Sequence, residues 1–125
     1  MELCEKLRKL ATVASTEFNE VLKNDPLILR DRIRLTFIDG SFMDIRYPVN
    51  HDYSFHWQRA GEVYRINTAP AHPEIETFPR HIHAGREEGV KPDTITSLDN
   101  SPEENLRQVL KWARKNSASR VDTNT

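Results

Sequence analysis

The sequence predicts an α+β fold: an N-terminal helix, a four- to five-stranded antiparallel sheet built as a meander, and a C-terminal helix. Apolar residues recur at helical spacing near both ends of the chain, and between residues 27 and 67 they alternate with polar ones. Asp39-Gly40 and Gly61 place turns between the alternating segments. A chain of 125 residues has room for one hydrophobic core. We therefore expect a single domain over residues 1–116 and a disordered polar tail over 117–125.

The first expected helix covers residues 2–23. Asn24-Asp25-Pro26 ends it, because proline disfavours the helical conformation for the residue before it. Between its charged residues, one apolar stripe is formed by Leu3, Leu7, Leu10, Ala14, Phe18, Val21 and Leu22. We expect this stripe to lie on the sheet.

The first two strands are joined by Ile38-Asp39-Gly40. A two-residue turn would place Asp44 opposite Leu35 and mix a carboxylate into the apolar face. A three-residue loop, with its glycine in the left-handed bulge conformation, instead pairs Leu35 with Met43 and Asp44 with Arg34. We expect this second register, because it keeps one face apolar. The two strands then cover residues 27–37 and 41–47, and Ile33 pairs with Ile45.

A second pair of strands surrounds the turn at Gly61. Across a four-residue turn, aromatic and branched side chains pair on one face, with Trp57 opposite Tyr64. On the other face His56 lies opposite Arg65, so an imidazole and a guanidinium are expected within reach of one ligand. The strands cover residues 53–59 and 62–67, with Gln58 paired to Val63 and Phe55 to Ile66.

The segment after these strands carries most of the remaining histidines. Prolines make residues 69–74 irregular, and we expect this segment to wrap back over the sheet. If residues 80–83 are extended, His81 and His83 share one side while Ile82 points inward. Residues 86–92 are expected to form a mobile connection, and residues 93–98 a short fifth strand.

The last helix begins with a recognisable capping sequence. Ser101 is the expected N-cap, Pro102 suits the first turn, and Glu104 completes a capping box. The helix is expected to end near Asn116. Its apolar stripe consists of Leu106, Val109, Leu110 and Ala113.

Composition and charge narrow the possible partners. The net charge of −1 and the pI near 6.5 give no overall attraction to nucleic acid or membrane. The lone Cys4 excludes an internal disulfide, and no signal peptide or membrane-spanning apolar run is found, so we expect a cytoplasmic protein. Arginine, which grips oxyanions with a fixed fork, supplies the cations of the central region: Arg30, Arg32, Arg34, Arg46, Arg59, Arg65, Arg80 and Arg86.

The histidines and arginines together fit RNA cleavage without a metal. That reaction needs a base near neutral pKa, an acid for the leaving oxygen and cations around the transition state. His56 beside Arg65 meets part of this requirement, and a further histidine would arrive from the following segment. The candidate catalytic residues are His56, Arg65, His72, His81 and His83, and the candidate substrate-binding residues are Arg32, Arg34, Arg80 and Trp57. No cofactor is expected.

Two other functions stay open. A sheet face lined by arginines is also typical of a non-catalytic module that binds nucleic acid or a protein. Alternatively, His81-x-His83 with His72 or Glu74 as third ligand offers ligand types that zinc accepts, as in a zinc hydrolase. The chain lacks the paired cysteines and the helical histidine pair of the stronger zinc signatures.

The order of four motifs between residues 27 and 97 resembles the TumE-type toxin family. These motifs are DGSFMDIRY, YSFHWQ, GEVYRINTAP and TFPRHIHAG. The resemblance implies a toxin of a toxin–antitoxin pair, an RNA-directed activity, and a cognate antitoxin that often carries a helix-turn-helix domain; a homodimer stays open. It points to His56, Trp57, Arg65, Pro70, His72, Pro79, His81 and His83. Asn67 and Ala71 replace an acid and a histidine of the family pattern, which implies reduced activity.

Overall fold

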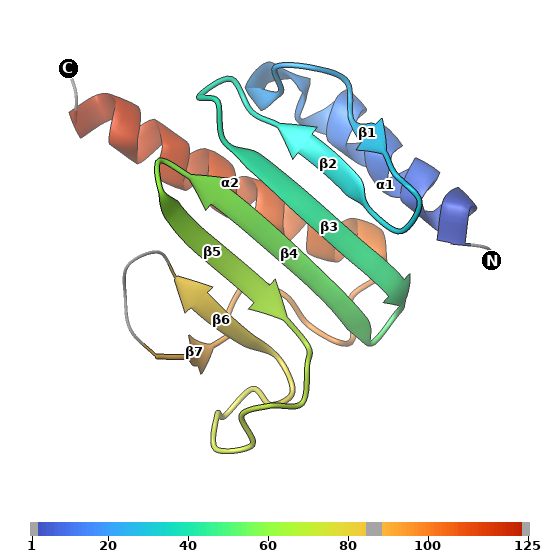
Figure 1. Ribbon diagram of the computed structural model, residues 1–125, viewed down its shortest axis with the longest axis vertical. Coiled ribbons are helices and arrows are strands. Elements are labelled where there is room, and N and C mark those ends of the chain that lie inside the picture. Colours follow the sequence, from blue (N-terminus) through green and yellow to red (C-terminus); the bar gives the residue numbers. More distant parts are fainter. Residues whose placement is uncertain (1–2, 85–88, 124–125) are drawn as a thin grey trace.

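A computed structural model describes residues 3–84 and 89–123, with side chains through residue 116 and without that of Ala84. Two helices lie on one face of an antiparallel sheet and leave its other face open (Figure 1). The helices are α1 (Leu3–Glu17) and α2 (Pro102–Thr123), with a short 3-10 helix at Asn19–Val21. The strands are β1 (Leu27–Ile28), β2 (Ile33–Thr36), β3 (Phe42–Val49), β4 (Asp52–Arg59), β5 (Glu62–Asn67), β6 (His81–Ala84) and β7 (Lys91–Pro92).

The predicted meander is confirmed, but its strand count was too low. Over the described ranges the sheet has seven strands in the order β1 to β7, so every strand pairs with its sequence neighbour. The expected strand 27–37 is broken by a turn in which the Leu29 N–H donates to the Arg32 carbonyl (2.8 Å). Three consecutive apolar residues at 27–29 already depart from strict alternation there. Residues 93–98 are not a strand, because the last strand is Lys91–Pro92.

The register predicted for the first hairpin is confirmed. Leu35 pairs with Met43 and Arg34 with Asp44, and Gly40 has a φ of 88°, a left-handed conformation that glycine adopts without strain. The second hairpin has the four predicted pairs and two more, Ser54 with Asn67 and Arg59 with Glu62. Its turn is therefore the two-residue Ala60-Gly61, with both residues at positive φ, as in the turns that suit twisted hairpins.

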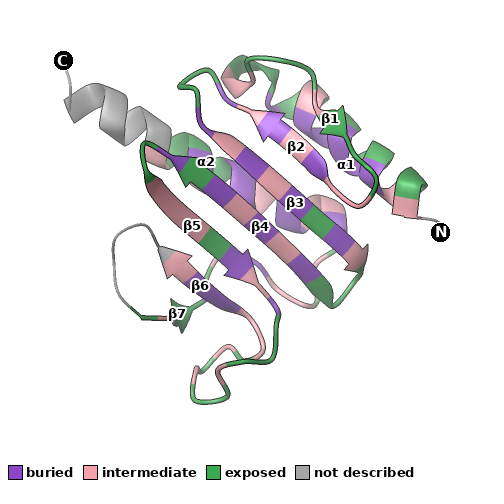
Figure 2. Cartoon of the chain, in the orientation of Figure 1, coloured by how far each residue is buried: buried purple, intermediate pink, exposed green. Residues whose placement is uncertain are grey.

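Burial alternates along the central strands as the sequence predicted (Figure 2). The side of the sheet under the helices forms one core with the apolar stripes of α1 and α2. Its largest fully buried side chains are Trp57, Tyr47, Tyr53, Phe55, Leu7, Leu10, Ile33, Leu35, Met43, Ile45, Ile66 and Leu106. Because side chains alternate along a strand, burying this set places the intervening polar residues on the uncovered face.

The N-terminal helix is shorter than the expected range 2–23. It ends at Glu17, because residues 21–23 turn to hydrogen-bond with the end of β2. The Lys23 N–H donates to the Thr36 carbonyl (2.8 Å), and the Ile38 N–H donates to the Val21 carbonyl (2.9 Å). Residues 21–23 therefore form backbone hydrogen bonds with the segment around the end of β2 in place of the helical hydrogen bonds that the apolar spacing predicted.

The C-terminal helix begins where predicted, but it runs to Thr123, past the expected end near Asn116. The hydroxyl of Ser101 accepts a hydrogen bond from the Glu104 N–H (3.1 Å), and Pro102 is the first helical residue.

The domain boundary at 116 and the disordered tail 117–125 stay predictions, since side chains from 117 on and residues 124–125 lie outside the described part. Of the expected mobile connection 86–92, residues 86–88 likewise lie outside it, whereas Lys91–Pro92 form β7. Neither described helix is long and apolar enough to cross a bilayer.

Candidate active site

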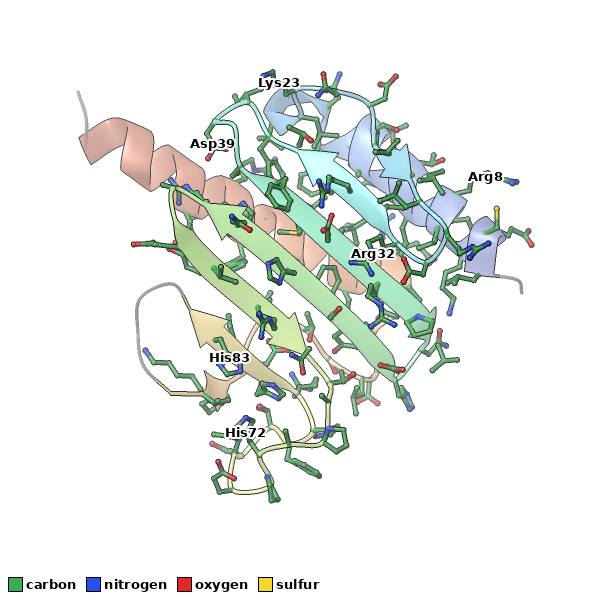
Figure 3. The ribbon with its side chains drawn as sticks, viewed as in Figure 1. Arg8, Lys23, Arg32, Asp39, His72 and His83 are labelled. Carbon is green, nitrogen blue, oxygen red and sulfur yellow. The ribbon has the colours of Figure 1, made fainter. Side chains whose placement is uncertain are left out.

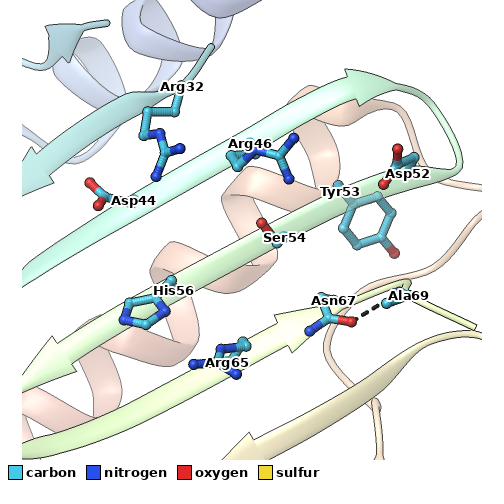
Figure 4. A pocket seen from close by; sticks show the side chains of 10 residues that line it. All are labelled: Arg32, Asp44, Arg46, Asp52, Tyr53, Ser54, His56, Arg65, Asn67 and Ala69. Atoms are coloured by element: carbon cyan, nitrogen blue, oxygen red, sulfur yellow. Dashed lines mark hydrogen bonds between the residues drawn. The ribbon is translucent and has the colours of Figure 1, made fainter. Parts of the chain in front are cut away.

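A shallow pocket of about 380 Å³ opens on the uncovered face of the sheet (Figure 4). Side chains from neighbouring strands meet there, with His56 on β4 next to Arg65 on β5. The lining residues are Arg32, Asp44, Arg46, Asp52, Tyr53, Ser54, His56, Arg65, Asn67 and Ala69. Its volume lies in the range of small-molecule sites, and its open side would admit a polymer.

Arg65 lies between two imidazoles. In the sheet register His56 pairs with Arg65, and Arg65 pairs in turn with His83 on β6. Adjacent strands are about 4.8 Å apart, so the two histidine backbones are separated by roughly 10 Å with the arginine between them. The sequence predicted the first pair; the second depended on the position of β6.

Among the described arginines that line the pocket, Arg65 is the one without a carboxylate partner. Arg34 forms two hydrogen bonds with the carboxylate of Asp44 (2.7 and 2.9 Å), and Arg32 forms two with Asp31 (2.9 and 3.2 Å). Arg65 is exposed and has no carboxylate partner among the side chains that the structure describes. An anion entering the pocket would therefore meet an unneutralised guanidinium.

Burial and neighbouring positive charges lower the pKa of both flanking histidines. Desolvation lowers the pKa of His56 below its usual 6.5, the charge of Arg65 lowers it further, and Asp44 opposes this shift. Desolvation likewise lowers the pKa of His83, with contributions from His81, Arg65 and His72. A neutral imidazole at pH 7 is the form that accepts a proton.

The sign of each charge effect on His56 can be tested directly. The groups that face this histidine are Arg65 from β5, Asp44 from β3 and Arg32 from the segment before β2. We expect Arg65→Gln to raise the His56 pKa, because a positive charge is lost, and Asp44→Asn to lower it. Histidine NMR titration measures both shifts. Arg8→Gln, on the helix side of the molecule, should leave the value unchanged, and shifts of the opposite sign would contradict the assigned electrostatics.

Two further imidazoles, those of His72 and His81, gather around His83 at the β6 end of the sheet (Figure 3). His81 and His83 lie on the same side of β6, as predicted, and the loop before it brings His72 against both. The ring centroids of His72 and His81 are 5.1 Å apart, and those of His81 and His83 are 5.4 Å apart. His81 is only 3% exposed.

A buried network around Asp93, which the sequence analysis missed, fixes this end of the sheet. The Asp93 carboxylate accepts hydrogen bonds from the backbone N–H groups of Ile95 (2.8 Å) and Thr96 (3.1 Å), and from the Thr96 hydroxyl. That hydroxyl also bonds the hydroxyl of Tyr53 (2.6 Å). An aspartate followed by threonine three residues later is a turn-capping pattern that could have signalled it.

The network also changes the expected role of Arg80. Its guanidinium donates to the Asp93 carbonyl (2.8 Å) and the Thr96 carbonyl, and it lies 3.6 Å from the Asp93 carboxylate. With these contacts its side chain is only 18% exposed. We therefore assign Arg80 to holding the start of β6 in place, a correction to the expectation that it binds substrate.

Trp57 is a second correction. The indole is 1% exposed, packs against Tyr64 and Trp112, and donates its N–H to the Ser41 hydroxyl (3.0 Å). It belongs to the face under α2, where a base on the open face cannot stack on it. Of the other expected substrate-binding residues, Arg32 lines the pocket, whereas Arg34 is held by Asp44 and by the Phe42 ring.

Comparison with known proteins now assigns the family. A family model described as Toxin TumE matches residues 3–117. The chain belongs to the TumE toxin family. TumE membership makes it a toxin of a toxin–antitoxin system, for which a cognate antitoxin is the natural partner. No curated protein and no solved structure matches the chain.

The TumE match includes the two positions at which this chain departs from the motif pattern. Asn67 lines the pocket, and its side-chain oxygen accepts a hydrogen bond from the Ala69 N–H (2.9 Å), closing the turn after β5. An aspartate could make the same bond. Ala71 is exposed in the loop beside His72.

Proposed function

We propose that this toxin is a metal-independent endoribonuclease acting on cytoplasmic RNA. The observation that carries the proposal is the guanidinium of Arg65, which no described carboxylate pairs with, between His56 and His83 on an open sheet face. Cleavage of a phosphodiester needs a cation at the phosphorus and proton-transfer groups on both sides of it. This row of three side chains offers that arrangement.

His56 is the proposed general base. As a neutral imidazole it takes the proton from a ribose 2′-hydroxyl while that oxygen attacks the adjacent phosphorus. The bond from phosphorus to the 5′-oxygen then breaks, and the leaving oxygen receives a proton from the second histidine in its protonated form. The products are a 2′,3′-cyclic phosphate and a 5′-hydroxyl, and Arg65 stabilises the charge that develops on the phosphoryl oxygens.

His83 is the better placed of the two expected second histidines. It pairs with Arg65 across the strands, whereas His81 pairs with Asn67. One ring nitrogen of His81 is already within hydrogen-bond distance of the Pro79 carbonyl (3.1 Å), and its side chain is buried. We therefore propose His83 as the acid, acting in the fraction of molecules that carry it protonated despite its lowered pKa. His72 and His81 pack against its ring and fix it.

The rest of the pocket suits a single-stranded RNA. Arg32 and Arg46 line the end away from His83, where they can bind flanking phosphates. Their guanidinium groups share Asp31, at 2.9 and 3.8 Å, so a polyanion would compete with one carboxylate for two cations. We include an antitoxin with a helix-turn-helix domain in the proposal as the partner that restrains this surface.

The proposed reaction has a direct test in EDTA. The purified toxin is expected to cleave an RNA oligonucleotide into fragments ending in 2′,3′-cyclic phosphate, identified by mass spectrometry. The same oligonucleotide with deoxyribose at the cleaved position should be resistant, because it lacks the attacking hydroxyl. Cleavage of the deoxy substrate, or no cleavage of RNA with or without added metal, would reject the proposal.

The arginine lining supports a second candidate, a module that binds RNA without cleaving it. Such a module would bind RNA with an affinity that falls steeply with salt, because each phosphate contact releases counterions. It would retain that affinity when His56 is replaced and lose it when Arg32 or Arg65 is replaced. Salt-sensitive binding without any cleaved product would favour this candidate.

A further inference from the structure

The three histidines at the end of the sheet form a set of metal-ligand atoms. His81 and His83 come from alternate positions of β6, and His72 comes from the loop that precedes it. One nitrogen of each ring lies within 4.8 Å of the corresponding nitrogens of the other two. Among the described residues, these three histidines are the group of histidine, cysteine or acidic side chains whose ligand atoms lie close enough together to hold one metal ion.

We propose that His72, His81 and His83 bind one divalent transition-metal ion of the zinc class. Zinc–nitrogen bonds of about 2.0–2.1 Å place tetrahedral ligands roughly 3.4 Å apart. A contraction of up to about 1.4 Å would bring the three nitrogens to that spacing, and His72 lies on a loop that can supply it. Three imidazoles leave a fourth position for water, and all-nitrogen ligation suits zinc, cobalt, nickel or copper.

The groups near the Nδ1 atoms of His81 and His72 also support a metal site. The Nδ1 atom of His81 lies 3.1 Å from the Pro79 carbonyl oxygen, and Nδ1 of His72 lies 3.5 Å from the Glu74 carboxylate. Metal-binding histidines characteristically donate their second N–H to a carbonyl or carboxylate, which fixes the tautomer and leaves Nε2 free to bind the ion. His81 therefore already has such a partner, and the Glu74 carboxylate lies close enough to His72 to become one.

Burial adds a reason for the cluster to take a cation. His81 is 3% exposed and His72 side-chain exposure is 32%, so the rings are partly removed from water. Three imidazoles packed edge to face repel one another when protonated. A single divalent ion would use all three lone pairs, and the nearby Glu74 would balance part of its charge.

The site shares His83 with the proposed catalytic row of His56, Arg65 and His83, and this part of the inference rests on the proposed function. A nitrogen that binds the metal cannot transfer a proton at the same time. Metal binding is therefore expected to inhibit RNA cleavage, so that the β6 cluster acts as a metal-operated switch on the toxin. The metal site itself requires no cleavage activity.

Binding is tested first, on the full chain without a histidine tag. Titration with Zn²⁺ by calorimetry, and with Co²⁺ by visible absorption, should give one site per chain. We expect His72→Ala and His81→Ala to weaken binding at least about 100-fold, and Glu74→Gln about 10-fold. His51→Ala, on the exposed turn between β3 and β4, is the matched control. Because Glu74 is an exposed side chain, its variant tests the site even if the histidine variants misfold.

Equal metal affinity in the wild type, His72→Ala and Glu74→Gln would overturn the metal site. The switch is tested separately, by the Zn²⁺ concentration that halves each protein's own cleavage rate in EDTA-treated buffer. That concentration should rise about 10-fold in Glu74→Gln. Cleavage that requires Zn²⁺ would overturn the switch and the metal-independent reaction together. Stoichiometric binding with no cleavage in any buffer would reject the proposed function and leave the metal site standing.

Discussion

Replacing His56 with alanine is expected to slow RNA cleavage by about 10²–10⁴-fold, the contribution usual for a single general base. His56 lines the pocket on β4, and its lowered pKa keeps it ready to accept a proton at pH 7. Single-turnover cleavage of an RNA oligonucleotide in EDTA measures the rate. The variant should melt near the wild-type temperature, because the half-buried ring makes no hydrogen bond with the described residues.

His51→Ala is the matched control, since it removes another imidazole from the same region of the chain. His51 is exposed at the turn that follows β3 and does not line the pocket. Its loss should leave the cleavage rate within about two-fold, as expected for a surface substitution. A His56→Ala protein that is folded and keeps more than about a tenth of the wild-type rate would refute His56 as the base.

Replacing Asp93 with alanine is expected to cost about 3–5 kcal/mol of unfolding free energy, the usual effect of breaking a buried ion pair from one side. The carboxylate is fully buried and accepts hydrogen bonds from Ile95 and Thr96, and its loss would leave Arg80 without a counter-charge. Small domains have only about 5–15 kcal/mol in total. Urea denaturation followed by circular dichroism should therefore show a much lower midpoint.

Asp99→Ala is the control for Asp93, because this aspartate is exposed a few residues further along the same connection. It should change the stability by no more than about 0.5 kcal/mol. Equal midpoints for the two variants would mean that the Asp93 network does not hold this end of the sheet. Because Arg80 precedes His81, we also expect Asp93→Ala to disturb the histidine cluster, which NMR of the imidazoles would detect.

The sequence by itself determined the central hairpins and the first pair of site residues. Alternation along the strands left one register that kept an apolar face, and Gly40 supplied the left-handed position that this register needs. The same reasoning placed His56 opposite Arg65, because side chains alternate with a period of two. The local sequence pattern is enough to predict strand pairing where a one-residue shift of register would turn the apolar side chains toward solvent.

Only the tertiary structure decided what distant segments bring together. His72 reaches His81 through a loop that has no regular period, and Arg80 is held by Asp93, thirteen residues further along the chain. Pairing with the end of β2 ended α1 early, although the apolar spacing continued to Leu22. Such contacts depend on the packing of whole elements against one another. The spacing of residues along the chain does not predict these contacts, because the local sequence around each residue is compatible with structures that lack its distant partner.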